Sequence, residues 1–357
     1  MSEEDYPARV NFIHSVSTTM YSLAFGIGTR NSQDEWLEVF FPRPIFRPSS
    51  ELVSQIAGAI NYEGGNRDIE LDGDKIQKLI DSIGEPEQKA ILSAMKGSRK
   101  PCVATLIESD TELRSTPETY LKLHLLSYRY VRPNEQNLHD LYAILPNVAW
   151  TDIGAVDLRE IDHLQLEARI QGRVLEVAGI DKFPKMTNYV VPTGVRIAHS
   201  ARVRLGAYLG EGTTVMHEGL VNFNAGTVGP NMIEGRVSQG VLLDAGSDLG
   251  GSGSTMGTLS GGGKLVISIG KDCLIGANAG CGISLGDRCT IEAGLYITAG
   301  TVVQVLDENK NPVKTAKARE LSGHSDMLFI RNSQTGVVEC RTNHHAISLN
   351  ESLHAHN

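Results

Sequence analysis

The sequence has few aromatic residues and no cysteine pair spaced for metal binding or redox chemistry. Only 6% of its 357 residues are Phe, Trp or Tyr. Its five cysteines form no CxxC pair, and an odd, dispersed set is typical of reduced thiols in the cytoplasm. We therefore expect a cytoplasmic protein with reduced thiols, of which Cys273, Cys281 and Cys289 serve as packing residues.

Long apolar runs and excess positive charge are also missing. No stretch approaches the roughly 18 apolar residues that a membrane span needs. The first residues, MSEEDYPARV, are acidic and lack the layout of a signal peptide. The net charge of −9 disfavours a nucleic-acid-binding surface, although it leaves room for local basic sites that bind an anionic cofactor. We expect neither a membrane nor a nucleic acid as partner.

The first 191 residues have a mixed α/β pattern. YSLAFGIGT and CVATLIES predict strands, and DGDKIQKLIDSI predicts a helix. STPETYLKLHLLSYRYV predicts another helix, with Thr116 as its N-cap and Pro117 at its first position. A further helix is expected around DLREIDHLQLEARIQG, followed by the strand-like VLEVAGI. We divide this part into an N-terminal α/β domain, residues 1–115, and an α/β connecting region, residues 116–191.

Beyond Pro192 the apolar pattern has a period of six, which fits neither a helix nor an alternating strand. This period is typical of hexapeptide repeats that wind a parallel β-helix, in which three hexads make a coil of about 18 residues. We expect a β-helix over residues 192–305 and a C-terminal capping segment over 306–357, where MLFIRNSQTGVVECRT predicts a hairpin. The repeated positions are Ile197, Val203, Leu209, Val215, Val221, then Val237, Leu243, Leu249, then Ile267, Cys273, Ala279, Leu285, Ile291, Ile297 and Val303.

Two interruptions separate these runs, Thr227–Arg236 and Gly250–Lys264. Interruptions in a solenoid usually map to surface loops, where function tends to be located, so we expect two inserted loops. The second interruption also has the composition of a linker or of a phosphate-binding loop. Its flanks, Leu249 and Ile267, stand three hexads apart in one register, which a linker would not preserve. Leu265 follows the Gly-Lys pair where a phosphate loop needs Ser or Thr.

Long motifs in this region resemble the tetrahydrodipicolinate N-succinyltransferases of the actinobacterial and pseudomonad type, a family of hexapeptide-repeat acyltransferases. The resemblance covers roughly residues 117–335 and is weak over the first hundred. The motifs are YLKLHLLSYR, DKFPKMTNYVVPTG, VPTGVRI, GTTVMHEGLVNFNAGTVG, MIEGRVSQGV, GSDLGGSGSTMGTLSGGG, VISIGKDCLIGANAG, GISLGDRCTIEAGLYITAGT and KARELSG.

The resemblance implies a left-handed parallel β-helix, an exception to the usual right-handed crossover. It also implies a homotrimer with active sites between adjacent β-helices. The implied reaction is the succinylation of L-2,3,4,5-tetrahydrodipicolinate by succinyl-CoA, in lysine and diaminopimelate biosynthesis. Its products are N-succinyl-2-amino-6-oxopimelate and free CoA.

Roles for individual residues follow from the same resemblance. Glu234 matches a glutamate that acts as general base or as acyl acceptor, and Gly257 matches a backbone N–H that donates to the oxyanion. Acyl transfer from a thioester needs both kinds of group. The positions implied to contact succinyl-CoA are Arg236, Gly251, Ser254, Ala277, Glu292, Ala293, Gly300, Lys317, Arg331, Asn332 and Ser333.

The resemblance also implies a magnesium ion on the trimer axis, bound by Glu218, but Ala201 stands where a companion aspartate is expected. His199 and His217 stand three hexads apart, so we expect them to stack on successive coils. This pair leaves open a zinc hydratase of the γ-carbonic-anhydrase type, for which no convincing third histidine is near. Two further hypotheses are another CoA-dependent acyltransferase and a β-helix that serves only as a scaffold.

Overall fold

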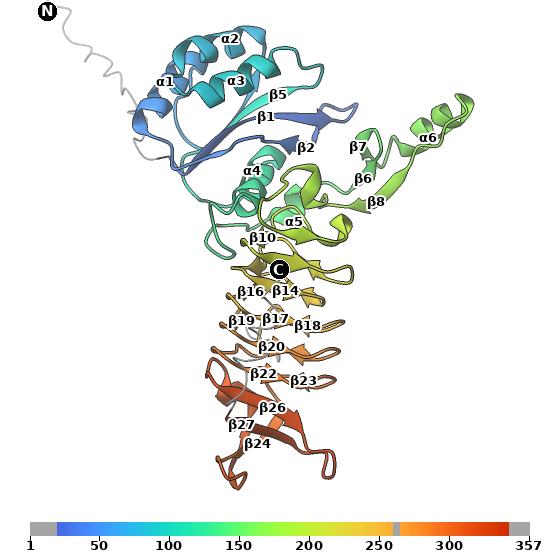
Figure 1. Cartoon of the computed structure of the whole chain (residues 1–357). Helices are drawn as coiled ribbons and strands as arrows, with labels where there is room; N and C mark the ends of the chain where they lie inside the picture. The colour runs from blue at the N-terminus through green and yellow to red at the C-terminus, as the bar shows by residue number, and fades with distance from the viewer. Residues whose placement is uncertain (1–19, 260–264, 343–357) are drawn as a thin grey trace, which may run out of the picture.

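The computed structural model describes residues 20–259 and 265–342. Figure 1 shows an α/β head, an arm that projects sideways, and a long column of stacked coils. A small sheet lies at the end of the column opposite the head. Within the described residues, no helix is both long and apolar enough to cross a membrane.

The head is a sheet covered by helices on both faces. The strand order is β2-β1-β5-β4, all antiparallel neighbours, with β3 added to β1. One face packs on α1, α2 and α3, and the other contacts α4. The elements are β1 (Ser22–Arg30), β2 (Trp36–Phe40), β3 (Ile45–Phe46), α1 (Ser50–Ile60), β4 (Arg67–Leu71), α2 (Gly73–Ser82), α3 (Pro86–Met95) and β5 (Cys102–Ile107).

Helix α4 (Thr116–Ser127) joins the head to the column, and all its residues are buried. Its N-cap is Ser115, whose hydroxyl accepts a hydrogen bond from the Glu118 N–H, so the predicted N-cap at Thr116 was one residue late. His124 donates from Nδ1 to the Tyr120 carbonyl at 2.6 Å and accepts the Phe41 N–H at Nε2. Burial lowers the pKa of His124 to about 4, so the ring is neutral at pH 7.

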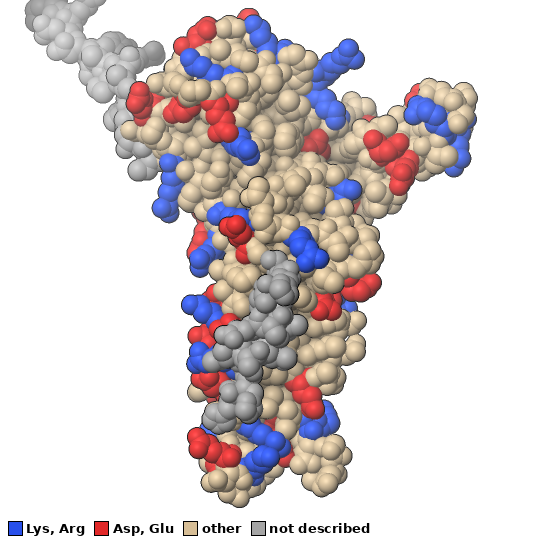
Figure 2. All heavy atoms as spheres, viewed as in Figure 1, with Lys and Arg blue, Asp and Glu red and all other residues tan. Residues whose placement is uncertain are grey.

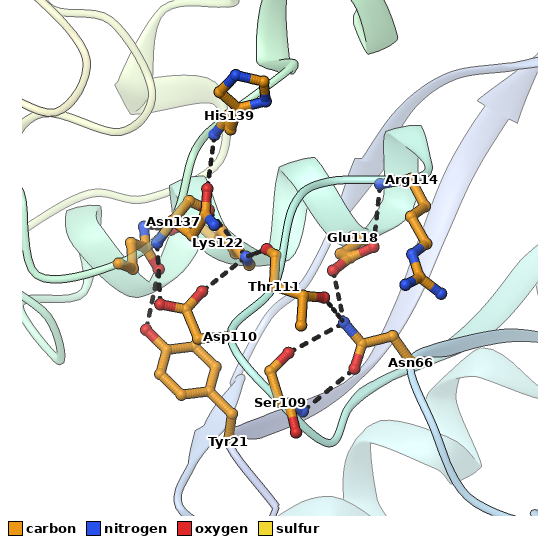
Figure 3. A network of polar contacts seen from close by, with 11 residues as sticks. Tyr21, Asn66, Ser109, Asp110, Thr111, Arg114, Glu118, Lys122, Asn137 and His139 are labelled. Atoms are coloured by element: carbon orange, nitrogen blue, oxygen red, sulfur yellow. Dashed lines mark hydrogen bonds and ion pairs between the residues drawn. The ribbon is translucent and has the colours of Figure 1, made fainter.

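A polar network ties the head to α4 and to the chain that follows it (Figure 3). Lys122 is fully buried, and its ammonium donates to Asp110 at 2.7 Å and to the carbonyls of Thr111 and Asn137 at 2.8 Å. All three ammonium donors therefore have partners, which offsets the cost of burying the charge. The role of this lysine is structural, since its donors are all used within the chain.

An arm, residues 148–181, follows the short helix α5 (Leu141–Ile144). It is a three-stranded antiparallel sheet in the order β7-β6-β8 with one helix, and it points away from the column in Figure 1. The predicted helix and following strand are confirmed as α6 and β8. The elements are β6 (Val148–Thr151), β7 (Gly154–Asp157), α6 (Ile161–Ile170) and β8 (Val177–Asp181).

The column is a parallel β-helix, as the six-residue period predicts. Its three sheets run β9-β11-β14-β17-β20-β22, β12-β15-β18-β21-β23 and β10-β13-β16-β19. The strands are β9 (Arg196–Ile197), β10 (Tyr208–Leu209), β11 (Thr213–Val215), β12 (Leu220–Val221), β13 (Gly226–Thr227), β14 (Asn231–Ile233), β15 (Arg236–Val237), β16 (Leu242–Leu243), β17 (Asp248–Leu249), β18 (Ser254–Thr255), β19 (Ser268–Ile269), β20 (Leu274–Ile275), β21 (Gly280–Cys281), β22 (Thr290–Ile291) and β23 (Tyr296–Ile297).

The first predicted loop is wrong, because Thr227–Arg236 belongs to the coil itself. It contains β13 and β14, whose Thr227 and Ile233 are buried in the core. The apparent interruption arises at one corner, where Ile233 is followed after only four residues by Val237. Leu220 consequently pairs with Arg236, which makes this coil two residues shorter than the coil that pairs Thr213 with Asn231. We call Glu234–Gly235 the short corner.

The second interruption is a real insertion, but a smaller one than predicted. Gly250 to Thr255 remain in the coil, and the chain leaves it only after β18, so that Ser254 pairs with Gly280 in an enlarged coil. Residues 260–264 of the predicted loop lie outside the described residues.

The insertion also shifts the predicted register by two residues from Ile267 to Ala279. Ile269, Ile275 and Cys281 hold the strand positions instead. The predicted register returns at Leu285, which bridges to Ile269, because the step from Cys281 to Leu285 is again only four residues.

The predicted C-terminal hairpin is confirmed and closes the column. Strand β26 adds in parallel to β22, and β27 pairs with it in the antiparallel sense. Cys273, Cys281 and Cys289 are buried in the column, as predicted for packing residues, and Cys340 is buried in the hairpin. The remaining elements are β24 (Val302–Leu306), β25 (Pro312–Lys317), β26 (Met327–Arg331), β27 (Val338–Thr342) and the single turns η1 (Met186–Asn188), η2 (Ser200–Arg202) and η3 (Ala318–Leu321).

Candidate active site

Most of the predicted site residues lie on two corner rows of the β-helix. The first corner row follows the β9–β22 sheet and precedes the β12–β23 sheet, and the second follows the β12–β23 sheet. Successive coils stack closely along the first row: a side-chain carbon at Gly250 would approach the Ala277 nitrogen to 2.7 Å. The first row includes Glu218, Glu234, Gly251, Ala277, Glu292 and Ala293, and the second includes Gln239, Gly257 and Gly300.

Glu234 stands at the short corner and is half-buried. Its N–H donates to the Leu249 carbonyl at 2.8 Å, which fixes the backbone against the next coil. Gly235 allows this close stacking, because a side-chain carbon there would lie 2.3 Å from the Gly253 carbonyl oxygen. Among the described residues, the Glu234 carboxylate has no recorded hydrogen bond or ion pair. It is therefore available to a ligand.

Two buried polar side chains that the sequence analysis missed hold the strand before Glu234. Asn231 donates to the carbonyls of Asp244 at 2.8 Å and Ser247 at 2.6 Å, and its oxygen accepts the Gly229 N–H. The Met232 N–H donates to Asp248 Oδ1 at 2.8 Å. For Asn231 the available signal was an amide side chain two places before an apolar strand position. The other coils have no amide at this place; they have Val195, Thr213, Ser247, Cys273 and Cys289.

Gly257 opens the insertion on the second corner row. Its carbonyl accepts the Ile267 N–H at 3.3 Å, while its own N–H has no partner among the described residues. A side-chain carbon at Gly257 would lie 3.0 Å from the Gln239 carbonyl oxygen, so a larger residue would push against that coil. Within the part of the chain that the structure describes, this N–H is therefore open to a ligand.

One chain does not bring Glu234 and Gly257 together. They lie on different corners, with the β12–β23 sheet between them. Arg236 and Ser254 are paired neighbours on this intervening sheet, and Arg236 is exposed. The predicted residues thus surround one face of the column rather than forming a closed pocket.

The C-terminal residues are placed at the ends of the two rows. The Arg331 N–H donates to Glu292 Oε2 at 2.7 Å, which extends the first row into the final hairpin. The Asn332 amide donates to Glu339 at 2.8 Å, and Ser333 follows it in the turn. Lys317 is exposed beside the second row, where it pairs with Val302.

The implied magnesium site is not supported by the residues present. Glu218 is mostly exposed, and its carboxylate lies 3.3 Å from the Arg202 guanidinium, which already supplies a positive charge. Ala201 offers no oxygen ligand. His199 and His217 lie on successive coils as predicted, with their rings edge to face and the centroids 5.2 Å apart. Within the described ranges, the one cluster of three metal-ligand types lies elsewhere, at Glu112, His139 and Asp140, all exposed.

Two family models match the chain. Residues 145–185 match "Tetrahydrodipicolinate N-succinyltransferase middle", and residues 266–299 match "Hexapeptide repeat of succinyl-transferase". Together with the coiled column and its open carboxylate, these matches define the protein as a hexapeptide-repeat acyltransferase.

Similar proteins extend this assignment over nearly the whole chain. The 2,3,4,5-tetrahydropyridine-2,6-dicarboxylate N-succinyltransferase of Pseudomonas paraeruginosa is 61% identical over 344 residues, covering 96% of this chain and 100% of that protein. The Vibrio cholerae protein of that name is 49% identical over 340 residues, covering 94% and 99%. The chain belongs to the 2,3,4,5-tetrahydropyridine-2,6-dicarboxylate N-succinyltransferase family.

A solved structure supports the fold. The crystal structure of a putative 2,3,4,5-tetrahydropyridine-2-carboxylate N-succinyltransferase from Campylobacter jejuni superimposes with a TM-score of 0.85 at 27% identity. The superimposed region covers 91% of this chain and 92% of the Campylobacter chain. The head, which resembles the family weakly in the motif comparison, is thus included in the similarity.

Proposed function

We propose that the protein transfers the succinyl group of succinyl-CoA to the nitrogen of L-2,3,4,5-tetrahydrodipicolinate, in lysine and diaminopimelate biosynthesis in the cytoplasm. The cyclic imine takes up water and its ring opens. The nitrogen forms a bond to the thioester carbonyl carbon, and the carbon–sulfur bond breaks. The products are N-succinyl-2-amino-6-oxopimelate and CoA, which leaves as the thiol.

The position of Glu234 carries this proposal. The Glu234 carboxylate, which has no partner in residues 20–259 and 265–342, is suited to accept the proton that the attacking amine or the ring-opening water must lose. The same carboxylate is also placed to take the acyl group itself before passing it to nitrogen. The Gly257 N–H would donate to the oxyanion that forms at the thioester carbonyl, a contact typically worth about 3 kcal/mol of barrier.

The separation of Glu234 and Gly257 favours a site shared between copies. We propose a homotrimer of left-handed β-helices, in which Glu234 of one copy faces Gly257 of a neighbouring copy. The CoA arm would lie between two columns, along the small residues Gly251, Ala277 and Ala293. Lys317 and Arg331, at the far ends of the two rows, would meet the CoA phosphates. No step is assigned to magnesium.

The test is thiol release from succinyl-CoA in the presence of tetrahydrodipicolinate, followed with a thiol reagent. The wild-type protein should release CoA only when both substrates are present, and acetyl-CoA measures the strictness for succinyl. Absence of CoA release by a folded, assembled wild type would refute the proposal. For the zinc hydratase, the described residues of one chain give His199 and His217 no third ligand, and stoichiometric zinc in the purified protein would favour it over the acyltransferase.

A further inference from the structure

The arm, residues 148–181, has almost no core of its own. From residue 158 to residue 181 only Ala168 and Leu175 are buried. The small apolar cluster at its base contains Leu37, Val148 and Ala155 and does not extend to α6. A helix and a sheet normally each bury one face against another element. In the arm, neither the helix α6 nor the strand β8 has such a buried face.

Large apolar side chains are exposed along the arm instead. Ile170 is 76% exposed, and Leu166 and Val174 on either side of it are 60% exposed. Ile153, in the turn between β6 and β7, and Ile180, on β8, are also exposed. Figure 2 shows the arm standing clear of the body with uncharged surface between its charged side chains. A concentration of exposed apolar side chains on one small unit is typical of an interaction surface.

A cavity lies under the arm where it meets the first coil. It has a volume of about 580 Å³ and is lined by Trp150, Ile180, Lys185 and Ala201, among others. A second cavity of about 330 Å³ adjoins it and shares Lys185 and Ala201. The arm and the first coil therefore form a concave surface that is wide enough to receive protein side chains.

The charges indicate what fills this surface. The arm contains seven carboxylates and three arginines, whereas the next segment, residues 182–204, contains five Lys or Arg and no carboxylate. Within one chain, Arg204 pairs with Asp181 at 2.7 Å. Among the described residues, Lys185 and Arg196 in the basic segment, and Asp152 and Glu176 on the arm, have no ion pair. The two segments of separate copies are complementary in charge.

We propose that the arm of one copy docks on the basic segment, residues 182–204, of a second copy of this chain. The exposed Val191 in that segment gives the apolar face of the arm a partner. Because arm and segment are different surfaces, the contact is heterologous, and it forms a ring where the rotation between successive copies closes. The number of copies in the ring is three, which rests on the homotrimer of the proposed function; the docking itself does not.

The first test measures mass in solution by light scattering during size-exclusion chromatography, across a range of protein concentrations. The double variant Leu166→Asp, Ile170→Asp should weaken association at least tenfold and so lower the assembled mass, with an unchanged circular dichroism spectrum. Val313→Asp is the matched control, since Val313 is 64% exposed on the C-terminal sheet, and it should assemble as wild type does. A wild-type monomer, or an arm variant that assembles normally, overturns the proposal.

The second test keeps the fold and changes only charge. Asp152→Lys with Glu176→Lys should weaken assembly, and so should Lys185→Glu with Arg196→Glu. The chain carrying all four changes should recover assembly, because the two surfaces are again opposite in sign. Failure of this recovery overturns the proposal. A wild type that assembles through the arm but releases no CoA refutes the proposed reaction alone, whereas an active assembly that the arm variants leave intact refutes the arm contact alone.

Discussion

Glu234 and Gly251 face each other across the short corner: a side-chain carbon placed on Gly251 would lie 3.6 Å from Oε2 of Glu234. The carboxylate thus stands over a residue without a side chain, on the next coil of the first corner row. Space beside an unpartnered carboxylate is what an acyl group and an amine need in order to approach it.

Glu234→Gln should lower kcat by roughly 10²–10⁴-fold, because the amide cannot accept the proton. The measurement is thiol release under saturating substrates, with mass and circular dichroism as checks on assembly and fold. His217→Ala is the control and should keep near-normal turnover. If His217→Ala is the inactive variant and Glu234→Gln is active, the base has been assigned to the wrong residue.

Gly257→Pro should lower kcat by about 10²–10³-fold, since proline has no N–H to stabilise the oxyanion. Gly257→Ala keeps the N–H and tests the shape of the corner, because its side chain would press on the Gln239 carbonyl. The alanine variant should retain more activity than the proline variant. Equal losses in the two would assign the effect to crowding.

Protonation of the buried His124 should lower the free energy of unfolding as the pH falls. Its pKa is about 4 in the fold and about 6.5 unfolded, so the unfolded chain binds the extra proton between these values. Stability is full above pH 6.5 and decreases below it, by about 3 kcal/mol in total near pH 4. Urea unfolding at pH 7 and pH 5 measures this, and His124→Gln should flatten that part of the profile.

The native thiols should be inert to a disulfide reagent at pH 8. All five cysteines are buried, and burial raises the pKa of Cys281 and of Cys340 to about 12. The reagent should label five thiols in guanidinium and almost none in the folded protein. Rapid labelling of the native protein would show that the core opens.

A chelator should leave both the melting temperature and the activity unchanged, because the Glu218 carboxylate already pairs with the Arg202 guanidinium and needs no metal ion. The double variant Ala201→Asp, Arg202→Ala restores an oxygen ligand and removes the competing charge. Its melting temperature should rise with added magnesium, whereas that of the wild type should not. Stoichiometric metal in purified wild type would contradict this expectation.

The sequence could predict the β-helix because coil cores need an apolar residue every six positions, and this requirement is local. It could not predict the short corner. A step of four residues instead of six displaces the apolar positions, and Thr227 in the core is polar, so the pattern seemed to stop where the coil in fact continued. The two-residue offset after the insertion was hidden in the same way, because the short step from Cys281 to Leu285 cancels it.

For the candidate site, the sequence could predict which residues take part but not which of them lie close together. Glu234 and Gly257 come from neighbouring coils, yet the corner on which each lies depends on the coil length between them. The arm was predicted as a helix and a strand, but no pattern within it indicated that its apolar side chains would stay uncovered. That depends on what the rest of the chain packs against it.

Shortened, regular and enlarged coils stack here with unbroken parallel pairing, as Leu220 with Arg236, Tyr208 with Gly226 and Ser254 with Gly280. Each coil touches only the coils above and below, so chain added or removed at a corner is absorbed there and the strands stay aligned. Corners are therefore the places where insertions and deletions can accumulate during evolution without disturbing the core. Both of the proposed catalytic groups lie at corners altered in this way, one shortened and one lengthened.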